Sequence, residues 1–127
     1  MRAVQSIWTS ERGWDQSPAK SDAQLVLAFG ATGTVTKSES WSELRRRHPG
    51  AILLGCTTGG EIHGCDVLDE TLSATAINFD RTEIAAAEAD ISQGSLEAGR
   101  LIGRNLSRAG LKALFVLSDG TRTNGSD

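Results

Sequence analysis

Three short, uninterrupted apolar runs constrain the fold of this chain more than any other feature. They occupy residues 25–29, 51–54 and 113–117, and each is followed by a small polar segment that contains glycine. Runs of this kind are typical of strands buried on both faces of a parallel sheet. If the three strands are parallel, the segments that follow them, residues 30–33, 55–60 and 118–125, meet at one edge of the sheet.

Two helices are predicted between these runs. Residues 38–48 form the first, because Ser40 and Glu43 have the spacing of a capping box at a helix start. Residues 92–109 form the second, which ends before Gly110, a residue typical of the position after a helix.

The remaining strands come from alternating or β-branched segments. Residues 4–8 predict a strand, and residues 71–79 and 82–90 predict an antiparallel hairpin joined by a two-residue turn. The order of the elements predicts an α/β fold, a layered mixed β-sheet with flanking helices. We expect residues 1–127 to form a single domain.

Composition narrows the function classes. The chain has 127 residues and a net charge of −3, and residues 51–100 alone carry 2 basic and 9 acidic side chains. Such an acidic middle disfavours nucleic acid as a partner. No apolar run reaches the ~20 residues of a membrane helix, and no signal peptide is visible. The expected location is therefore cytoplasmic, with no membrane partner, and reduced thiols are the default state of the two cysteines.

The segment after the second apolar run is the sharpest candidate for a binding site. Its glycines permit positive φ and close backbone approach, while its amides and hydroxyls can cradle a carboxylate or phosphate. A structural turn is an equally weighted alternative. The segment consists of Gly55, Cys56, Thr57, Thr58, Gly59, Gly60 and Glu61.

The reactive side chains also allow other interpretations. Cys56 as a nucleophile, with His63 and Asp119, is one alternative, although a free cysteine is more often a small buried apolar residue. Either His48 or His63 is a potential haem or metal ligand. His48 shares a helix face with apolar residues, which favours packing instead, and the residue spacings predict no metal site.

A basic stripe follows the second predicted helix. Arg100, Arg104 and Arg108 recur every four residues, which places them on one helix face. A solvated helix face is the usual explanation, and a partner surface is the alternative.

The pieces of the chain, taken in order, resemble the FIST sensory domain family, specifically its N-terminal half. The resemblance spans residues 22–127 and centres on a hydrophobic strand that enters a Gly-Cys-Thr-Thr-x-Gly-Glu-Ile segment. It is also carried by the strand at residues 25–29 and by the lead into the motif at residues 49–51. The later Phe-Val-Leu-Ser-Asp-Gly segment at residues 115–120 agrees as well.

This resemblance implies a function. FIST domains are proposed sensors of bacterial and archaeal signal transduction that bind small ligands such as amino acids and act on a signalling output protein or domain. One branch comprises haem proteins that sense nitric oxide. The motif matches make residues 55–61, together with Asp119 and Gly120, the expected ligand-binding residues, and no cofactor is assigned. The resemblance does not imply an enzyme.

The resemblance also implies that the chain holds only part of a longer domain. The family continues past residue 120 through a further helix and more sheet. One face of the sheet would then be uncovered, and exposed apolar surface favours a homo-oligomer. A non-catalytic assembly fragment is therefore the third alternative to a ligand sensor.

Overall fold

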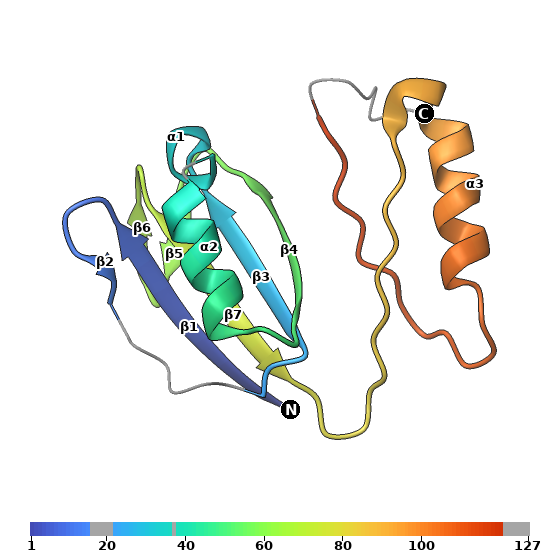
Figure 1. Cartoon of the computed structure of the whole chain (residues 1–127), viewed down its shortest axis with the longest axis horizontal. Coiled ribbons are helices and arrows are strands. Elements are labelled where there is room, and N and C mark those ends of the chain that lie inside the picture. Colours follow the sequence, from blue (N-terminus) through green and yellow to red (C-terminus); the bar gives the residue numbers. More distant parts are fainter. Residues whose placement is uncertain (16–21, 37, 121–127) are drawn as a thin grey trace. The chain divides into compact units, whose positions relative to one another are not determined.

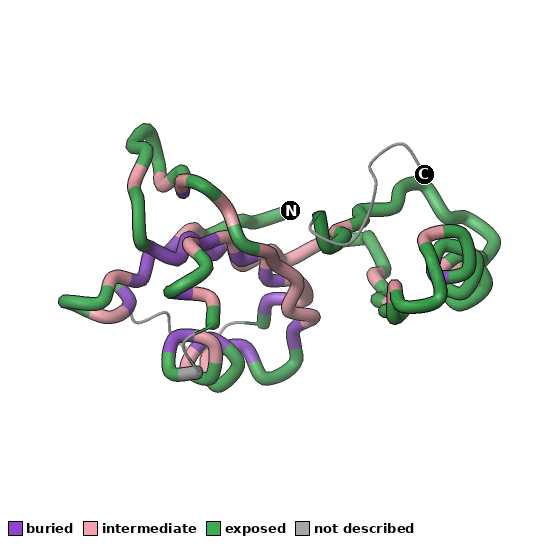
Figure 2. Tube along the Cα trace, turned by 90° about the horizontal axis from the view of Figure 1, so that it is seen from above, coloured by how far each residue is buried: buried purple, intermediate pink, exposed green. Residues whose placement is uncertain are grey.

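The computed structural model describes residues 1–15, 22–36 and 38–120. The chain forms two compact units, Met1–Ile84 and Ala85–Asp127 (Figure 1), which we describe separately. Most of the buried residues belong to the first unit (Figure 2). The prediction that residues 1–127 form a single domain stays a prediction.

A five-stranded mixed sheet forms the frame of the first unit. Its order is β2-β1-β7-β3-β4, so that β7 is the central strand and β4 an edge strand. Strands β3 and β4 are parallel, whereas β7 runs antiparallel to both β1 and β3. With the helices, this mixed sheet confirms the predicted α/β class. The strands are β1 (Arg2–Thr9), β2 (Gly13–Trp14), β3 (Leu25–Gly30), β4 (Ile52–Thr57) and β7 (Leu72–Asn78).

One face of this sheet is more deeply buried than the other. Along β3 the burial alternates, with Val26 and Ala28 fully buried and Leu25, Leu27 and Phe29 half-buried. The prediction that this strand is buried on both faces is therefore wrong. Its continuous apolar sequence reflects a packed face and a second face that is only partly shielded.

Helix α2 (Ser38–Arg47) packs against the covered face and matches the predicted helix closely. Leu44 is 1% exposed and joins Trp8, Val26 and Leu72 in the core. Ser40 is not at the helix start, as the expected capping box requires, because α2 already begins at Ser38. The hydroxyl of Ser40 donates to the carbonyl of Thr34 at 3.2 Å. Thr34 lies in the short helix α1 (Thr32–Val35), so this bond joins the two helices.

A small hairpin lies against the second face of the sheet. Strands β5 (Glu61–His63) and β6 (Asp66–Leu68) pair with each other in an antiparallel two-stranded sheet. The carbonyl of Ile62 accepts hydrogen bonds from Gln5 on β1 and Ser73 on β7. The hairpin therefore covers the part of this face formed by β1 and β7.

The predicted hairpin of residues 71–79 and 82–90 is half wrong. Its first segment is β7, but residues 82–90 form no strand. The physical reason is that both edges of β7 are already occupied, one by β1 and the other by β3. A strand at residues 82–90 would have no free edge of β7 to pair with.

The described part of the second unit contains a 3-10 turn, η1 (Ile91–Gln93), and helix α3 (Ser95–Leu106). The predicted strand at residues 113–117 is wrong, because the only regular elements described in this unit are helical and offer no strand edge. Leu114, Phe115 and Val116 are 51%, 59% and 62% exposed. Residues 121–125 of the third predicted loop lie outside the described residues.

Within the described ranges, no helix has both the length and the apolar character needed to cross a membrane.

His48 follows the last residue of α2 and makes the folding stability depend on pH. It is 2% exposed, its amide donates to the Leu44 carbonyl, and burial followed by the Arg47 charge lowers its pKa below 6.5. The unfolded chain therefore takes up a proton at a higher pH than the folded chain does. The contribution of His48 to the free energy of unfolding is fully present above about pH 6.5. It is lost as the pH drops below this value, by up to ~1.4 kcal/mol per pH unit.

Urea unfolding of the wild type and of His48→Gln at pH 7.5 and 5.5 checks this expectation. The wild type should lose more stability between the two pH values than the variant, whatever the variant's absolute stability. Equal losses in both proteins would contradict it.

Candidate functional site

The carboxyl ends of β3 and β4 lie side by side, as predicted for two of the three glycine-bearing loops. Gly30 is opposite Thr57 in the parallel register, and the Thr58 amide donates to the Gly30 carbonyl at 2.9 Å. The parallel ladder therefore continues one residue beyond β4. This places the first loop and the Gly55–Glu61 motif at a common edge.

A third segment, at the start of β7, completes this edge. The amide of Ala31 donates to the carbonyl of Thr71 at 3.1 Å, and the hydroxyl of Thr34 donates to the carbonyl of Glu70 at 3.1 Å. Glu70 has a positive φ of 56°, which is uncommon for a residue other than glycine. Three chain segments are thus joined by backbone-directed hydrogen bonds.

The carboxylate of Glu61 fixes the motif loop from inside. Glu61 is 1% exposed, and its Oε1 accepts the Thr58 hydroxyl at 2.7 Å. Its Oε2 accepts the amide and the hydroxyl of Thr71 at 3.2 and 2.9 Å. Three donors satisfy the buried carboxylate, as buried charge requires. One of the donors expected to bind the carboxylate of a ligand, the Thr58 hydroxyl, therefore already donates to a carboxylate of the protein itself.

Glycine is needed at position 55 because two strands approach closely there, and not because the residue has a positive φ. A Cβ on this residue would lie far inside contact distance of the Ala28 carbonyl oxygen on the neighbouring strand. Neither Gly55 nor Gly59 nor Gly60 has a positive φ, so the expected conformational role of the glycines is wrong for this loop. The tight contact between β3 and β4 is what requires glycine at position 55.

The outer surface of the loop is polar and open. Thr57 and Gly59 are exposed, and within the described residues the Thr57 hydroxyl has no hydrogen-bond partner. Gly60 lies near Asp69, since a Cβ at Gly60 would be 3.7 Å from the Asp69 carboxylate. The edge therefore presents donors beside an exposed carboxylate.

The remaining predicted site residues lie elsewhere. Asp119 and Gly120 belong to the second unit, in a segment without regular structure, and both are exposed. Cys56 is half-buried on β4, opposite Phe29 in the register. The structure thus groups residues 55–61 in the first unit and leaves Asp119 and Gly120 in the second.

The structure does not place His63 beside Cys56, as the alternative of a catalytic cysteine requires. The imidazole Nε2 of His63 lies 3.7 Å from a carboxylate oxygen of Asp15, and Asp15 also accepts the amide of Ile7 on β1. Strands β7 and β3 separate β1 from β4, which places Cys56 roughly 14 Å from β1 at ~4.8 Å per strand. His63 is therefore oriented by Asp15 and lies away from Cys56.

Neither histidine fits a haem iron. His48 is 2% exposed in a packed core, which has no room for a porphyrin next to the imidazole. The Nδ1 atom of His63 is buried without a hydrogen-bond partner in the described part of the chain, while Nε2 faces Asp15. Among the described residues, no group of three metal-ligating side chains occurs.

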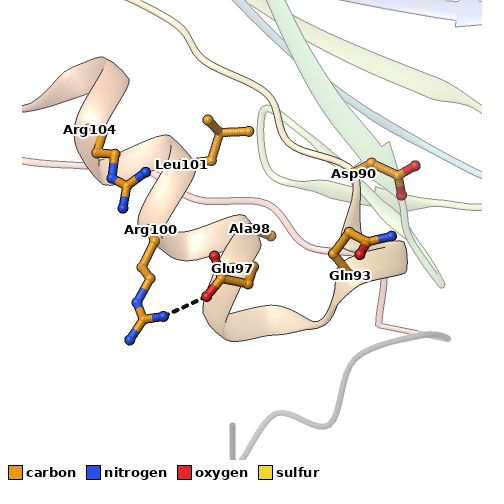
Figure 3. A pocket seen from close by; sticks show the side chains of 7 residues that line it. All are labelled: Asp90, Gln93, Glu97, Ala98, Arg100, Leu101 and Arg104. Atoms are coloured by element: carbon orange, nitrogen blue, oxygen red, sulfur yellow. Dashed lines mark hydrogen bonds and ion pairs between the residues drawn. The ribbon is translucent and has the colours of Figure 1, made fainter.

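In the second unit, part of the basic stripe borders a shallow hollow of about 200 Å³ between η1 and α3 (Figure 3). Arg100 pairs with Glu97 at 2.5 Å on the exposed helix surface. Acidic and basic side chains both border the hollow, so no single ligand charge is favoured. Its lining residues are Asp90, Gln93, Glu97, Ala98, Arg100, Leu101 and Arg104.

Sequence reasoning missed the residues that hold the site from outside the motif. Thr71 gives two of the three hydrogen bonds to Glu61, Gln5 binds the β5–β6 hairpin, and Asp15 pairs with His63. Each lies far from its partner in the chain, so no local spacing identifies it. The only available signal is the polar Gln5 within an otherwise strand-like segment.

Comparison with known proteins agrees with the motif. The sequence model of the FIST N domain matches residues 24–127. The chain therefore belongs to the FIST N domain family. FIST domains are sensory domains of signal-transduction proteins and are not known as enzymes. Neither the curated proteins nor the solved structures contain a significant match.

Proposed function

We propose that the chain is a non-enzymatic sensory domain that binds a small zwitterion, such as an amino acid, at the edge formed by β3 and β4. The observation that carries this proposal is the motif loop, which is anchored from inside by Glu61 and open outside. A fixed backbone with unused donors is preorganised for a ligand, which lowers the entropic cost of binding.

The chemistry of the edge selects the ligand class. The hydroxyl of Thr57 and the amides of Gly59 and Gly60 would receive the ligand carboxylate. The exposed carboxylate of Asp69 would receive its ammonium group, which is the role expected from the sequence for Asp119. A signalling output protein or domain would read the resulting change in conformation, because a ligand shifts an equilibrium by its differential affinity.

Removing the Thr57 hydroxyl tests the site. Calorimetric screening of the amino acids identifies the ligand, and Thr57→Val should then bind it about fivefold more weakly, the effect of one lost hydrogen bond. Asp69→Asn should weaken it further by removing a charge-assisted partner. Thr82→Val, at an exposed threonine outside the motif, is the matched control. Unchanged affinity in Thr57→Val and Asp69→Asn would refute the site.

We also propose that the chain forms a homo-oligomer. The support is the part of the second sheet face outside the β5–β6 hairpin, where Leu27, Phe29 and Leu54 are only half-buried, and the outer edge of β4, which pairs with no further strand among the described residues. Edge strands without charged residues are prone to pair with other chains. Light scattering at working concentration should give more than one chain per particle, and a monomer would contradict this expectation.

A further inference from the structure

We infer that Glu70 is a positioning residue of the ligand site proposed above. Its backbone directs the carboxylate of Asp69 outward, to the motif loop, and the side chain of Thr71 inward, to Glu61. The inference rests on the proposed function and adds to it a residue that acts through Asp69. Glu70 itself does not touch the ligand.

The backbone of Glu70 has a conformation that residues with a side chain disfavour. Its φ is 56°, and the other positive φ values among the described residues belong to glycines. The Cβ of an L-residue crowds the backbone in this region, so glycine and asparagine are its usual occupants. The side chain of Glu70 does not explain the conformation, because the residue is exposed and its carboxylate has no hydrogen bond or ion pair within the described residues. The explanation therefore lies in its neighbours.

The two neighbours of Glu70 face opposite ways. Thr71 is 6% exposed, and its amide and hydroxyl both donate to the carboxylate of Glu61. Asp69 is exposed, and its carboxylate would lie 3.7 Å from a Cβ added to Gly60 in the motif loop. In a continuous extended chain, the side chains of residues i and i+2 point to the same side. The left-handed residue between Asp69 and Thr71 breaks this alternation, so that one faces outward and the other inward.

Hydrogen bonds from a neighbouring segment hold this conformation. The carbonyl of Glu70 accepts the Thr34 hydroxyl at 3.1 Å, and the carbonyl of Thr71 accepts the Ala31 amide at 3.1 Å. Both donors belong to the segment that follows β3, which contains α1. A disfavoured backbone conformation persists where its surroundings determine it in this way, and such residues cluster at binding sites. The turn at residues 69–71 is therefore fixed before a ligand arrives.

A purely structural role of this turn predicts a different result. Residues 69–71 also connect β6 to β7, and a tight connection alone requires a turn. In that case a substitution of Glu70 weakens binding through the whole loop, and its effect adds to that of Asp69→Asn. If Glu70 acts through Asp69, it has little left to position once the Asp69 carboxylate is removed. The two effects on affinity are then not additive.

Titration of the full chain with glycine tests this coupling. Glycine carries only the ammonium and carboxylate groups that the site is proposed to receive, and the NMR signals of the Gly59 and Gly60 amides report its binding. Asp69→Asn should weaken binding about tenfold, the effect of losing a charge-assisted hydrogen bond. Glu70→Val, whose branched Cβ disfavours a positive φ, should weaken it about fivefold. The double variant should stay within about twofold of Asp69→Asn alone, and an additive loss of about fiftyfold would overturn the inference.

Two further variants keep the test decisive. Glu70→Asn tolerates a positive φ, so it should bind glycine within about twofold of the wild type and raise the urea midpoint of unfolding by about 0.3 M. Weaker binding by this variant also overturns the inference. If Glu70→Val does not fold, Thr34→Val, which removes the hydroxyl that holds the Glu70 carbonyl, replaces it in the same comparison. A wild-type chain that does not bind glycine at all would count against the proposed site, and the inference would fall with it, whereas additive losses overturn the inference alone.

Discussion

Gly55→Ala should destabilise the first unit by more than about 3 kcal/mol, enough to unfold much of a marginally stable protein. The new methyl group would overlap the carbonyl oxygen of Ala28, which is backbone and cannot rotate away. Relief requires β4 to separate from β3, and this breaks the parallel ladder between them. Urea unfolding followed by circular dichroism measures the loss.

Gly59→Ala is the matched control for this substitution. It lies in the same loop, has no atom within 4 Å of the added methyl position and does not have a positive φ. We expect its stability to stay within ~0.5 kcal/mol of the wild type. Similar losses in both variants would show that the loop, and not the contact with β3, governs stability.

Glu61→Ala should cost about 3 kcal/mol of folding stability, because it leaves the two buried donors of Thr71 and the half-buried hydroxyl of Thr58 without their acceptor. Glu61→Gln should recover part of this loss, since its carbonyl oxygen can accept from one side while its amide group faces the other donors. The free energy of unfolding of both variants, measured by urea titration, checks this order.

Glu39→Ala is the appropriate comparison. Glu39 is exposed in the first turn of α2, where an acidic side chain contributes only a few tenths of a kcal/mol. If Glu61→Ala is as stable as Glu39→Ala, the buried carboxylate does not anchor the motif loop. The proposed ligand site would then lose its preorganised frame.

Local patterns predicted the elements whose stability is mainly local. Helix α2 lies within the predicted helix of residues 38–48, and strands β1, β3 and β4 coincide with the predicted strands at residues 4–8, 25–29 and 51–54. The expected hairpin partner at residues 82–90 was wrong because strand pairing depends on which edges are free. That β7 is central, between β1 and β3, follows from contacts that no local segment encodes.

The same distinction applies to the candidate site. The motif of residues 55–61 was found from its glycines and hydroxyls, and the parallel pair of β3 and β4 confirmed its position at a strand-end edge. The inward orientation of Glu61 was not predictable, because it depends on Thr71, ten residues away in the segment that precedes β7. A sequence motif names the residues of a loop, but tertiary contacts decide which of them face a ligand.

The pairing of β1 with β7 also constrains when the chain can fold during synthesis. Arg2 is opposite Asn78 in the register. Strand β1, the first to leave the ribosome, can therefore pair with β7 only after this last strand of the unit has been synthesised. Until then its principal edge is unpaired, and β3 and β4 lack the central strand that joins them to β1. Such distant pairing slows folding. The nascent chain should therefore gain its sheet in one late step, after residue 78 has emerged, and not strand by strand.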